Sequence, residues 1–470
     1  MSSICTSNVT SGFIDLATFD EIEKYLYGGP DATAYFVRET RKATWFTQVP
    51  VVLSRAAGSP AFGQEWSVAI SRAGDYMLQT WLRLTTPAVT LATGNSVDAL
   101  HPTMTGSNAP ARIRWTRNFM HNIVRECCIT FNDLIAARFD NYHLDFWAAF
   151  TVPAGKRNGY NNMIGNFDAM TVPARSIASY TLNLPLPFFY SRDSGVALPT
   201  AALPYNEMRI NFHFRDWNHL LVFEDLAANP AGSTPKDYRY AITSNDLGGT
   251  PILGNTQVWA NYAIVSNDER KRMACAPRDI LVEQVQTAPR QSYTPATNGQ
   301  QSFDIRFSHA IKVLFFSVRN STHHAEWSNY QTSSPIPTTS SINYDPTGSA
   351  DAILQTSLIY ENTNRLAQMG SDYFSLVNPY YHAPFIPLET GYHTYSYSLD
   401  FISLDPMGST NYGKLTNVSI VPECSGAAKD ASRGVGLAGA NFSQTYEFIV
   451  TAVNNNIIRV SGGALGFPVL

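Results

Sequence analysis

The stretch Leu184–Phe214, LPLPFFYSRDSGVALPTAALPYNEMRINFHF, decides the fold class of this chain. It begins with Pro-bounded aromatic residues, turns at Arg192–Gly195 and ends in a strict alternation of apolar and polar side chains. One face carries Met208, Ile210, Phe212 and Phe214, and the other carries Arg209, Asn211, His213 and Arg215. This pattern predicts an antiparallel strand with one face on a core. The stretch holds no nucleophile elbow, phosphate loop or metal cluster.

The composition extends this prediction to the whole chain. The 470 residues favour two or three domains, and 44% of them are hydrophobic, enough for a large core. Aromatic residues at 12%, with 27 Pro and 29 Gly, are typical of short strands joined by many turns. Charged residues make up 15%, against roughly 25% in average soluble domains. A surface so poor in charge indicates that other subunits cover much of it.

Charge and targeting signals exclude several classes of partner. The net charge is −4 and the sequence has no basic patch, so we expect no direct contact with nucleic acid. We find no run of about eighteen apolar residues and no signal peptide, so we expect neither a membrane span nor secretion. The N-x-S/T sites at Asn8, Asn320, Asn417 and Asn441 are then expected to be Asn-rich turns.

The cysteines do not form a metal-binding or disulfide pattern. Cys5, Cys127, Cys128, Cys275 and Cys424 include no C-x-x-C pair, which argues against a zinc site. Free buried thiols in a reducing compartment are the expected state. Cys127 and Cys128 are adjacent in a predicted strand, so their side chains should face opposite sides, one toward a core and one toward an interface.

The chain divides into an arm and two strand-rich blocks. Residues 1–37 form the arm, with one short helix begun by a capping box at Thr18 and Glu21 and ended by Gly28-Gly29. The first block covers 38–267, a charged helical turn covers 268–282 and the second block covers 283–470. Because many short strands with few helices form sandwiches or barrels, we expect an all-β chain of two sandwiches, each favoured as an eight-stranded jelly roll.

Several elements within the blocks can be predicted more closely. Residues Trp66–Leu84 predict a hairpin that turns at Arg72–Asp75, and His121–Asn132 predicts a strand. Aromatic residues at helical spacing between Phe139 and Phe150 predict a core helix. In the second block Asn454–Asn456 predicts a turn before the strand Ile457–Val460.

The sequence offers weak candidates for chemistry. Gly434–Gly439 satisfies G-x-G-x-x-G, but it follows no strand and starts no helix, so a flexible loop is the better interpretation. His323-His324 with Glu326 is the one tight histidine group, and its polar surroundings favour a surface loop over a jelly-roll metal enzyme. We therefore predict no catalytic, cofactor-binding or metal-binding residues and no enzyme. A carbohydrate-binding β-sandwich using Tyr380-Tyr381-His382 remains an alternative.

Ordered motifs along almost the whole chain resemble the major capsid proteins of the large nucleocytoplasmic DNA viruses, above all the iridoviruses that infect invertebrates. The matching stretches are Phe13–Gly29, Thr44–Thr47, Pro60–Glu65, the R-x-G-D of Arg72–Asp75, Gly159–Gly165, the D-E-R-x-R region Asn267–Met273, Leu184–Phe214 and Ser461–Phe467. Four segments do not match: Thr86–Ala111, Glu224–Thr256, His323–Leu354 and Glu423–Asn441. We expect these to be exposed, with Thr86–Ala111 and Ser328–Ala350 on the outer surface.

The resemblance implies a double jelly roll and a structural subunit of an icosahedral capsid. It implies pseudo-hexagonal homotrimers that tile the outer shell of a virion around an internal membrane, assembled in the host cytoplasm. The implied partners are further copies of the chain together with minor capsid and membrane-associated viral proteins. Membrane proximity would come through the arm or the minor proteins, and no cofactor is implied.

Overall fold

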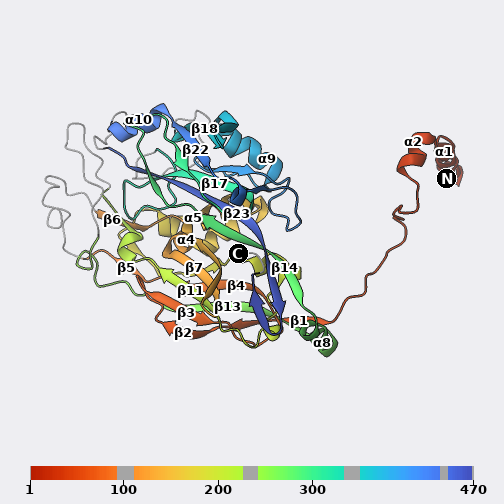
Figure 1. Ribbon diagram of the computed structural model, residues 1–470, viewed down its shortest axis with the longest axis horizontal. Helices are drawn as coiled ribbons and strands as arrows, with labels where there is room; N and C mark the ends of the chain where they lie inside the picture. The colour runs from red at the N-terminus through yellow and green to blue at the C-terminus, as the bar shows by residue number, and fades with distance from the viewer. Residues whose placement is uncertain (1, 93–110, 226–241, 333–349, 435–442, 468–470) are drawn as a thin grey trace. The chain divides into compact units, whose positions relative to one another are not determined.

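The computed structural model describes residues 2–92, 111–225, 242–332, 350–434 and 443–467 (Figure 1). The chain forms two compact units, Met1–Trp45 and Phe46–Leu470. The first unit contains the arm, residues 1–37, and the second holds all the strands of the described residues.

The arm contains two helices, α1 (Ser2–Ala17) and α2 (Glu21–Leu26), where the sequence predicted one. The predicted capping box at Thr18 and Glu21 is wrong. The box is formed by Asp20 and Glu23, and the backbone N–H of Asp20 donates to the Glu23 carboxylate at 3.3 Å. The Thr18 hydroxyl donates instead to the carbonyl of Asp15, at the end of the helix that the sequence did not reveal. Since α1 is rich in Ser and Thr, it lacks the strong apolar stripe that predicts a helix.

The first half of the large unit is a sandwich of two antiparallel sheets. One sheet has the order β1-β13-β4-β10, and the other has the order β2-β3-β11-β7-β8. The strands are β1 (Phe46–Val52), β2 (Ser54–Gly58), β3 (Glu65–Ala69), β4 (Tyr76–Thr85), β7 (Val124–Phe131), β8 (Leu134–Asp140), β10 (Thr181–Pro185), β11 (Met208–Phe214) and β13 (Gly254–Val265). Smaller pairs join β5 (Val89–Thr90) to β9 (Ser176–Ile177) and β6 (Ala111–Trp115) to β12 (Leu221–Asp225).

The second half repeats this strand order. Its sheets run β14-β23-β17-β20 and β16-β22-β18-β19. The strands are β14 (Arg278–Thr287), β16 (Phe303–Asp304), β17 (Ala310–Asn320), β18 (Ile353–Tyr360), β19 (Thr363–Gly370), β20 (His393–Ser396), β22 (Val418–Cys424) and β23 (Tyr446–Ser461), with β15 (Gln291–Tyr293), β21 (Thr410–Asn411) and β24 (Ala464–Gly466) at the margins. With β2 and the short strands β5, β6, β9, β12, β15, β21 and β24 set aside, each half has eight strands. It places the first, eighth, third and sixth in one sheet and the second, seventh, fourth and fifth in the other. The prediction of two jelly rolls is confirmed.

Short helices connect the strands. They are α4 (Phe119–Ile123), α5 (Asn141–Thr151), α6 (Ala154–Ile164), α7 (Asp168–Thr171), α8 (Asn267–Cys275), α9 (Asn378–His382) and α10 (Gly426–Arg433), and a π-helical turn at Tyr373–Val377 precedes α9. The helices predicted between Phe139 and Phe150 and at the charged run after Val265 are confirmed as α5 and α8. The alternation in β11 is also confirmed, because Met208, Ile210, Phe212 and Phe214 are buried and the residues between them are half-buried.

Three local predictions are wrong. The strands β3 and β4 form no hairpin, since they lie in opposite sheets and the turn between them crosses the sandwich. The strand expected at His121 begins at Val124, after α4. Asn454–Asn456 form no turn but continue β23, because the facing strand supplies amide partners: Gln286 Nε2 donates to Asn454 Oδ1 at 2.9 Å, and Asn456 Nδ2 donates to Gln284 Oε1 at 3.0 Å.

The two rolls share a core along β17. Leu314 and Phe316 point into the second roll, while Val313 and Phe315 pack with the first. The helix α5 lies between the strands of the two rolls (Figure 1) and is buried on nearly all sides. The rings of Phe146 and Phe150 stack on Phe315, with centroid distances of 5.9 and 5.5 Å. The rolls therefore form one packed body.

We predict that Phe146→Ala lowers the free energy of unfolding by about 3–5 kcal/mol, because it opens a cavity between the rolls that rigid sheets cannot close. Urea unfolding of the purified chain measures the change. The matched control is Tyr205→Ala, since Tyr205 is an exposed aromatic residue and its loss should change stability by less than about 0.5 kcal/mol. An unchanged midpoint for Phe146→Ala would contradict a shared core.

Candidate functional site

The histidine group at His323, His324 and Glu326 lies at the junction between the rolls, and the prediction of a surface loop is wrong. His323 and Glu326 are 2% exposed, and the residues that follow are buried as far as Thr332. Glu326 forms a buried ion pair with Arg114 of the first roll. The segment is polar because its partners are polar side chains of the other roll, and a single sequence cannot reveal such partners. Ser328–Thr332, expected on the outer surface, are also buried.

Trp327 is the centre of this junction. Its ring lies between two guanidinium groups, with Arg215 at 3.6 Å and Arg319 at 3.7 Å from the ring centroid. Its Nε1–H donates to the carbonyl of His219 at 2.8 Å, and its backbone N–H donates to Thr116 Oγ1 at 3.0 Å. Burial lowers the pKa of Arg215 to about 9. Cation–π contacts of this kind strengthen when water is excluded. Because Arg215 belongs to the first roll and Arg319 to the second, the Trp327 ring stabilises the contact between the two rolls.

Asp145 on α5 gathers hydrogen bonds from both rolls. Its carboxylate accepts from Ser328 Oγ and Tyr330 OH, each at 2.8 Å, and lies 2.8 Å from His121 Nδ1. The other nitrogen of His121 lies 2.6 Å from Tyr160 OH. Burial raises the pKa of Tyr330. A buried carboxylate is tolerated only with several donors, so this network fixes the position of α5 rather than supplying a reactive group.

The R-x-G-D and D-E-R-x-R motifs meet in the fold. Arg270 of α8 donates to both carboxylate oxygens of Asp75, at 2.8 and 3.0 Å, and the backbone N–H of Val265 donates to Asp75 at 3.0 Å. Arg72 donates to the carbonyls of Leu203, Pro204 and Asn206. A Cβ on Gly74 would lie 2.6 Å from the Cβ of Tyr262, so the motif requires glycine there. These residues anchor α8 to the first roll.

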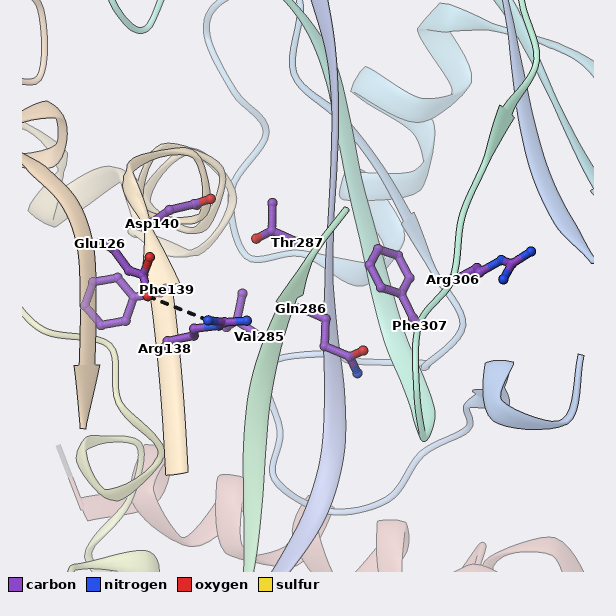
Figure 2. A pocket seen from close by; sticks show the side chains of 9 residues that line it. All are labelled: Glu126, Arg138, Phe139, Asp140, Val285, Gln286, Thr287, Arg306 and Phe307. Carbon is purple, nitrogen blue, oxygen red and sulfur yellow. Dashed lines mark ion pairs between the residues drawn. The ribbon is translucent and has the colours of Figure 1, made fainter. Parts of the chain in front are cut away.

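A cavity of about 440 Å³ lies beside the junction (Figure 2). It is lined by Glu126, Arg138, Phe139, Asp140, Val285, Gln286, Thr287, Arg306 and Phe307. Its polar groups serve the fold: Asp140 accepts from the backbone N–H of His143 at the start of α5, and Gln286 donates to Ser308 O at 2.7 Å. Burial raises the pKa of Asp140. Figure 2 shows Glu126 paired with Arg138, at 3.8 Å.

The remaining candidates supply no reactive centre. Gly434 ends α10 in the left-handed region, with φ of 75°, and most of the G-x-G-x-x-G run lies outside the described residues. Among the described residues, no group of three His, Cys, Asp or Glu side chains could hold a metal ion. In the same part of the chain, no helix has the length and apolar character needed to cross a membrane.

The four cysteines whose side chains are described are free thiols, as expected, but their expected burial is wrong for Cys275, which is exposed, and for Cys128, which is half-buried. Cys127 is buried and Cys128 is half-buried on the other face, as their adjacency predicted. The side chain of Cys5 is outside the described residues. The N-x-S/T sites are not all turns: Asn8 lies in α1, and Asn320 ends β17 with only 1% exposure. Asn417 is exposed before β22, and Asn441 lies outside the described residues.

Two regions of the described residues each carry several exposed apolar side chains. The arm exposes Phe13, Ile22, Tyr25, Tyr35 and Phe36, with Tyr25 at 87% and Tyr35 at 90%. On the second roll, Val377, Tyr380 and Tyr381 are exposed on one side of the helix that ends at His382. Large apolar side chains exposed together indicate surfaces that are covered in an assembly. Most of the loops at Thr86–Ala111 and Ser328–Ala350 lies outside the described residues, so their predicted place on the outer surface stays a prediction there.

Comparisons with known proteins identify the family. Residues 34–265 match the family described as "Major capsid protein N-terminus", and residues 269–466 match "Large eukaryotic DNA virus major capsid protein". The chain is 66% identical to the major capsid protein of Costelytra zealandica iridescent virus, over 100% of both chains. It is 64% identical to that of Tipula iridescent virus, over 98% of each. The chain belongs to the major capsid proteins of the iridescent viruses.

The fold comparison agrees with this family. The structure titled "PBCV-1 virus capsid, quasi-atomic model" has a TM-score of 0.71 at 20% identity and covers 93% of this chain and 100% of its own. The family resemblance drawn from the motifs is therefore confirmed. Members of this family are structural proteins of the virion shell and not enzymes, so the polar junction described above holds a capsid subunit together.

The contact between Asp75 and Arg270 should make stability depend on pH. Burial raises the pKa of Asp75, but the hydrogen bonds from Arg270 and Val265 outweigh burial, so the pKa lies below its usual value. The stabilisation is present above the unfolded-state pKa, about 3.9, and is lost as the pH falls through the folded-state pKa. We predict that Asp75→Asn lowers the free energy of unfolding at pH 7 by about 1–3 kcal/mol and flattens its decline below about pH 4.

Urea unfolding between pH 3 and pH 7 measures this dependence. The matched control is Asp279→Asn, because Asp279 forms an exposed pair with Arg459. This control should leave the profile almost unchanged. An Asp75→Asn profile parallel to that of the natural chain would show that Asp75 does not carry the effect.

Proposed function

We propose that this chain is the repeating unit of an icosahedral capsid, and that three copies form a pseudo-hexagonal trimer that tiles the outer shell around an internal membrane. The observation that carries the proposal is the repeated strand order of the two rolls within one packed body. We place the first roll at residues 38–267, the linker at 268–282 and the second roll at 283–470, with residues 1–37 as the arm.

The mechanism is geometric. Each copy supplies two similar rolls, so three copies around one axis supply six, and a block with six similar sides can tile a flat facet. Each contact between copies would join the second roll of one copy to the first roll of the next. This is a heterologous interface that closes by rotation.

The arm is the proposed contact with other components. Its two helices expose their apolar side chains, and a helix as short as α2 is marginal in water by itself. We propose that the arm binds minor capsid and membrane-associated viral proteins as the shell assembles in the host cytoplasm. No role in nucleic-acid binding is proposed, because the net charge is −4 and the sequence has no basic patch.

We predict that the purified chain sediments as a trimer both at low salt and at roughly 0.5 M salt, because contacts poor in charge are little affected by screening. Each pairwise contact should bury more than about 2,000 Å², as obligate interfaces do. Sedimentation velocity measures the mass. A stable monomer in both conditions would remove the trimer, and a trimer that separates only at high salt would show that charge pairs hold it.

We predict that deletion of Met1–Gly29 leaves the melting transition of the double roll within a few degrees but impairs shell formation. The physical reason is that the arm is a compact unit of its own, separate from the body that begins at Phe46. Calorimetry measures the transition, and electron microscopy of assembled material measures shell formation. A large loss of thermal stability would instead place the arm in a core.

A further inference from the structure

A structural repeat links the two rolls more closely than the sequence does. In the first roll, β7 and β8 are joined by Asn132-Asp133 and lead directly into α5. In the second, β18 and β19 are joined by Glu361-Asn362 and lead directly into the helix that spans residues 371–382. The four turn residues all have positive φ, at 49° and 65° in the first roll and 46° and 63° in the second. The two hairpin–helix units therefore occupy equivalent places in their rolls.

The first of these units makes the junction inside the chain. The helix α5 packs on the outer face of the sheet β14-β23-β17-β20, where Phe146 and Phe150 stack on Phe315 of β17. Beside it, the edge strand β8 approaches the edge strand β14, and Gln284 Nε2 donates to the carbonyl of Ala136 at 3.0 Å. A hairpin and a helix of one roll thus cover a sheet of the other.

The second unit has no such cover within the described residues. The helix 371–382 turns Phe374 and Asn378 inward, at 1% and 2% exposure. On its other side Val377, Tyr380 and Tyr381 are 41%, 69% and 72% exposed. The edge strand β19 is also largely exposed. The helix is buried in the first unit and open on one side in the second, and β19 has no buried residue while β8 has two, Ala136 and Phe139.

A matching sheet face on the first roll is partly open, with Val52 and Pro185 exposed and Trp81 and Trp259 half-buried. The sheet β1-β13-β4-β10 is the equivalent of β14-β23-β17-β20, and β4 takes the place of β17. On its outer face Val52, Trp259, Trp81 and Pro185 lie side by side in register across all four strands. The two tryptophan rings are parallel within 8°, with centroids 6.3 Å apart. This apolar stripe is rimmed by polar residues, including Gln79 and Arg83 of β4.

Charge favours the same pairing. Arg83 is the charged residue among β1, β4, β10 and β13. Between Arg365 and Lys414 the second roll carries Asp372, Asp400 and Asp405 and no Lys or Arg, while Glu389 in the same stretch pairs with Arg117 of the first roll. Asp372 is exposed on the helix itself. The open helix is thus apolar and acidic, and the open sheet face is apolar with one basic group.

We propose that the helix 371–382 of one copy packs on the stripe Val52–Trp259–Trp81–Pro185 of the next copy, with β19 beside β1, in the way that α5 and β8 pack on the second roll inside each chain. This inference rests on the proposed trimer and names the surfaces that close it. Each copy has one helix and one stripe, so the contact is head-to-tail. The occupant is a second copy of this chain, since the chain itself holds the template of the contact.

The first experiment is Tyr380→Ser with Tyr381→Ser, studied by sedimentation equilibrium. Aromatic residues at the centre of an interface carry much of its binding energy, so we expect the concentration needed for trimers to rise at least tenfold. The monomer should keep its melting temperature, because both rings are exposed. The matched control is Tyr205→Ser, which removes a tyrosine that is 76% exposed elsewhere on the first roll and should leave assembly unchanged.

The second experiment tests the pairing itself. In a Cys275→Ser background, Val377→Cys and Gln79→Cys together should give covalent trimers on mild oxidation. Either cysteine alone should give none, because a head-to-tail contact brings the two different positions together. Cross-linked dimers from one cysteine alone would indicate a symmetric contact and overturn the proposal.

The outcomes separate this inference from the trimer itself. If the double serine variant remains as trimeric as the natural chain and the cysteine pair does not cross-link, the trimer stands and these surfaces are wrong. If the natural chain is monomeric at every concentration tested, the trimer fails, and the inference fails with it.

Discussion

The burial of β17 on both faces is the constraint on which the rest of the structure depends. Most strands of a jelly roll have one face on the core and one face toward solvent, which gives an alternating sequence. In β17 nearly every residue is buried. Leu314 and Phe316 pack in the core of the second roll, and Phe315 packs against α5 of the first roll. Because the second roll's core and α5 of the first roll pack on opposite faces of this one strand, the two sandwiches cannot move independently. The chain therefore offers a shell one rigid block.

Buried charge keeps this block in a single arrangement. Arg114 pairs with Glu326 across the junction. Lys312 of β17 pairs with Glu283 of β14 within the second roll, and Glu283 also lies 3.2 Å from Arg192 of the first roll. Such pairs add little net stability compared with apolar packing, but a shifted arrangement would leave a buried charge without a partner. In a chain with only 15% charged residues, placing several of them inside supports one relative position of the rolls.

The sequence predicted the parts whose signal is local. The strand β11 and the helix α5 follow from the spacing of apolar residues within each segment, and the helix α8 follows from its run of charged residues. The predictions failed where a partner distant in sequence determines the outcome. His323–Thr332 has the composition of a surface loop, but Arg114, Arg215 and Asp145 give it buried partners. Likewise Asn454–Asn456 has the composition of a turn, but Gln284 and Gln286 hold it in a strand. The R-x-G-D motif is visible in the sequence. Its contact with Arg270 depends on how the chain folds, so the sequence alone does not predict it.

The two equivalent helices show how one fold can serve both folding and assembly. The helix α5 uses Phe146 and Phe150, which are covered as soon as the chain folds and never meet water in the native state. The helix 371–382 has Tyr380 and Tyr381 on its exposed side, where α5 has the two phenylalanines that pack on the other roll. Tyrosine combines a large apolar ring with a hydroxyl that water can solvate, so it suits a surface that must stay soluble in the free subunit and become buried later. The repeat in backbone is thus accompanied by a change in side chains, and in the proposed trimer that change distinguishes the contact within the chain from the one between chains.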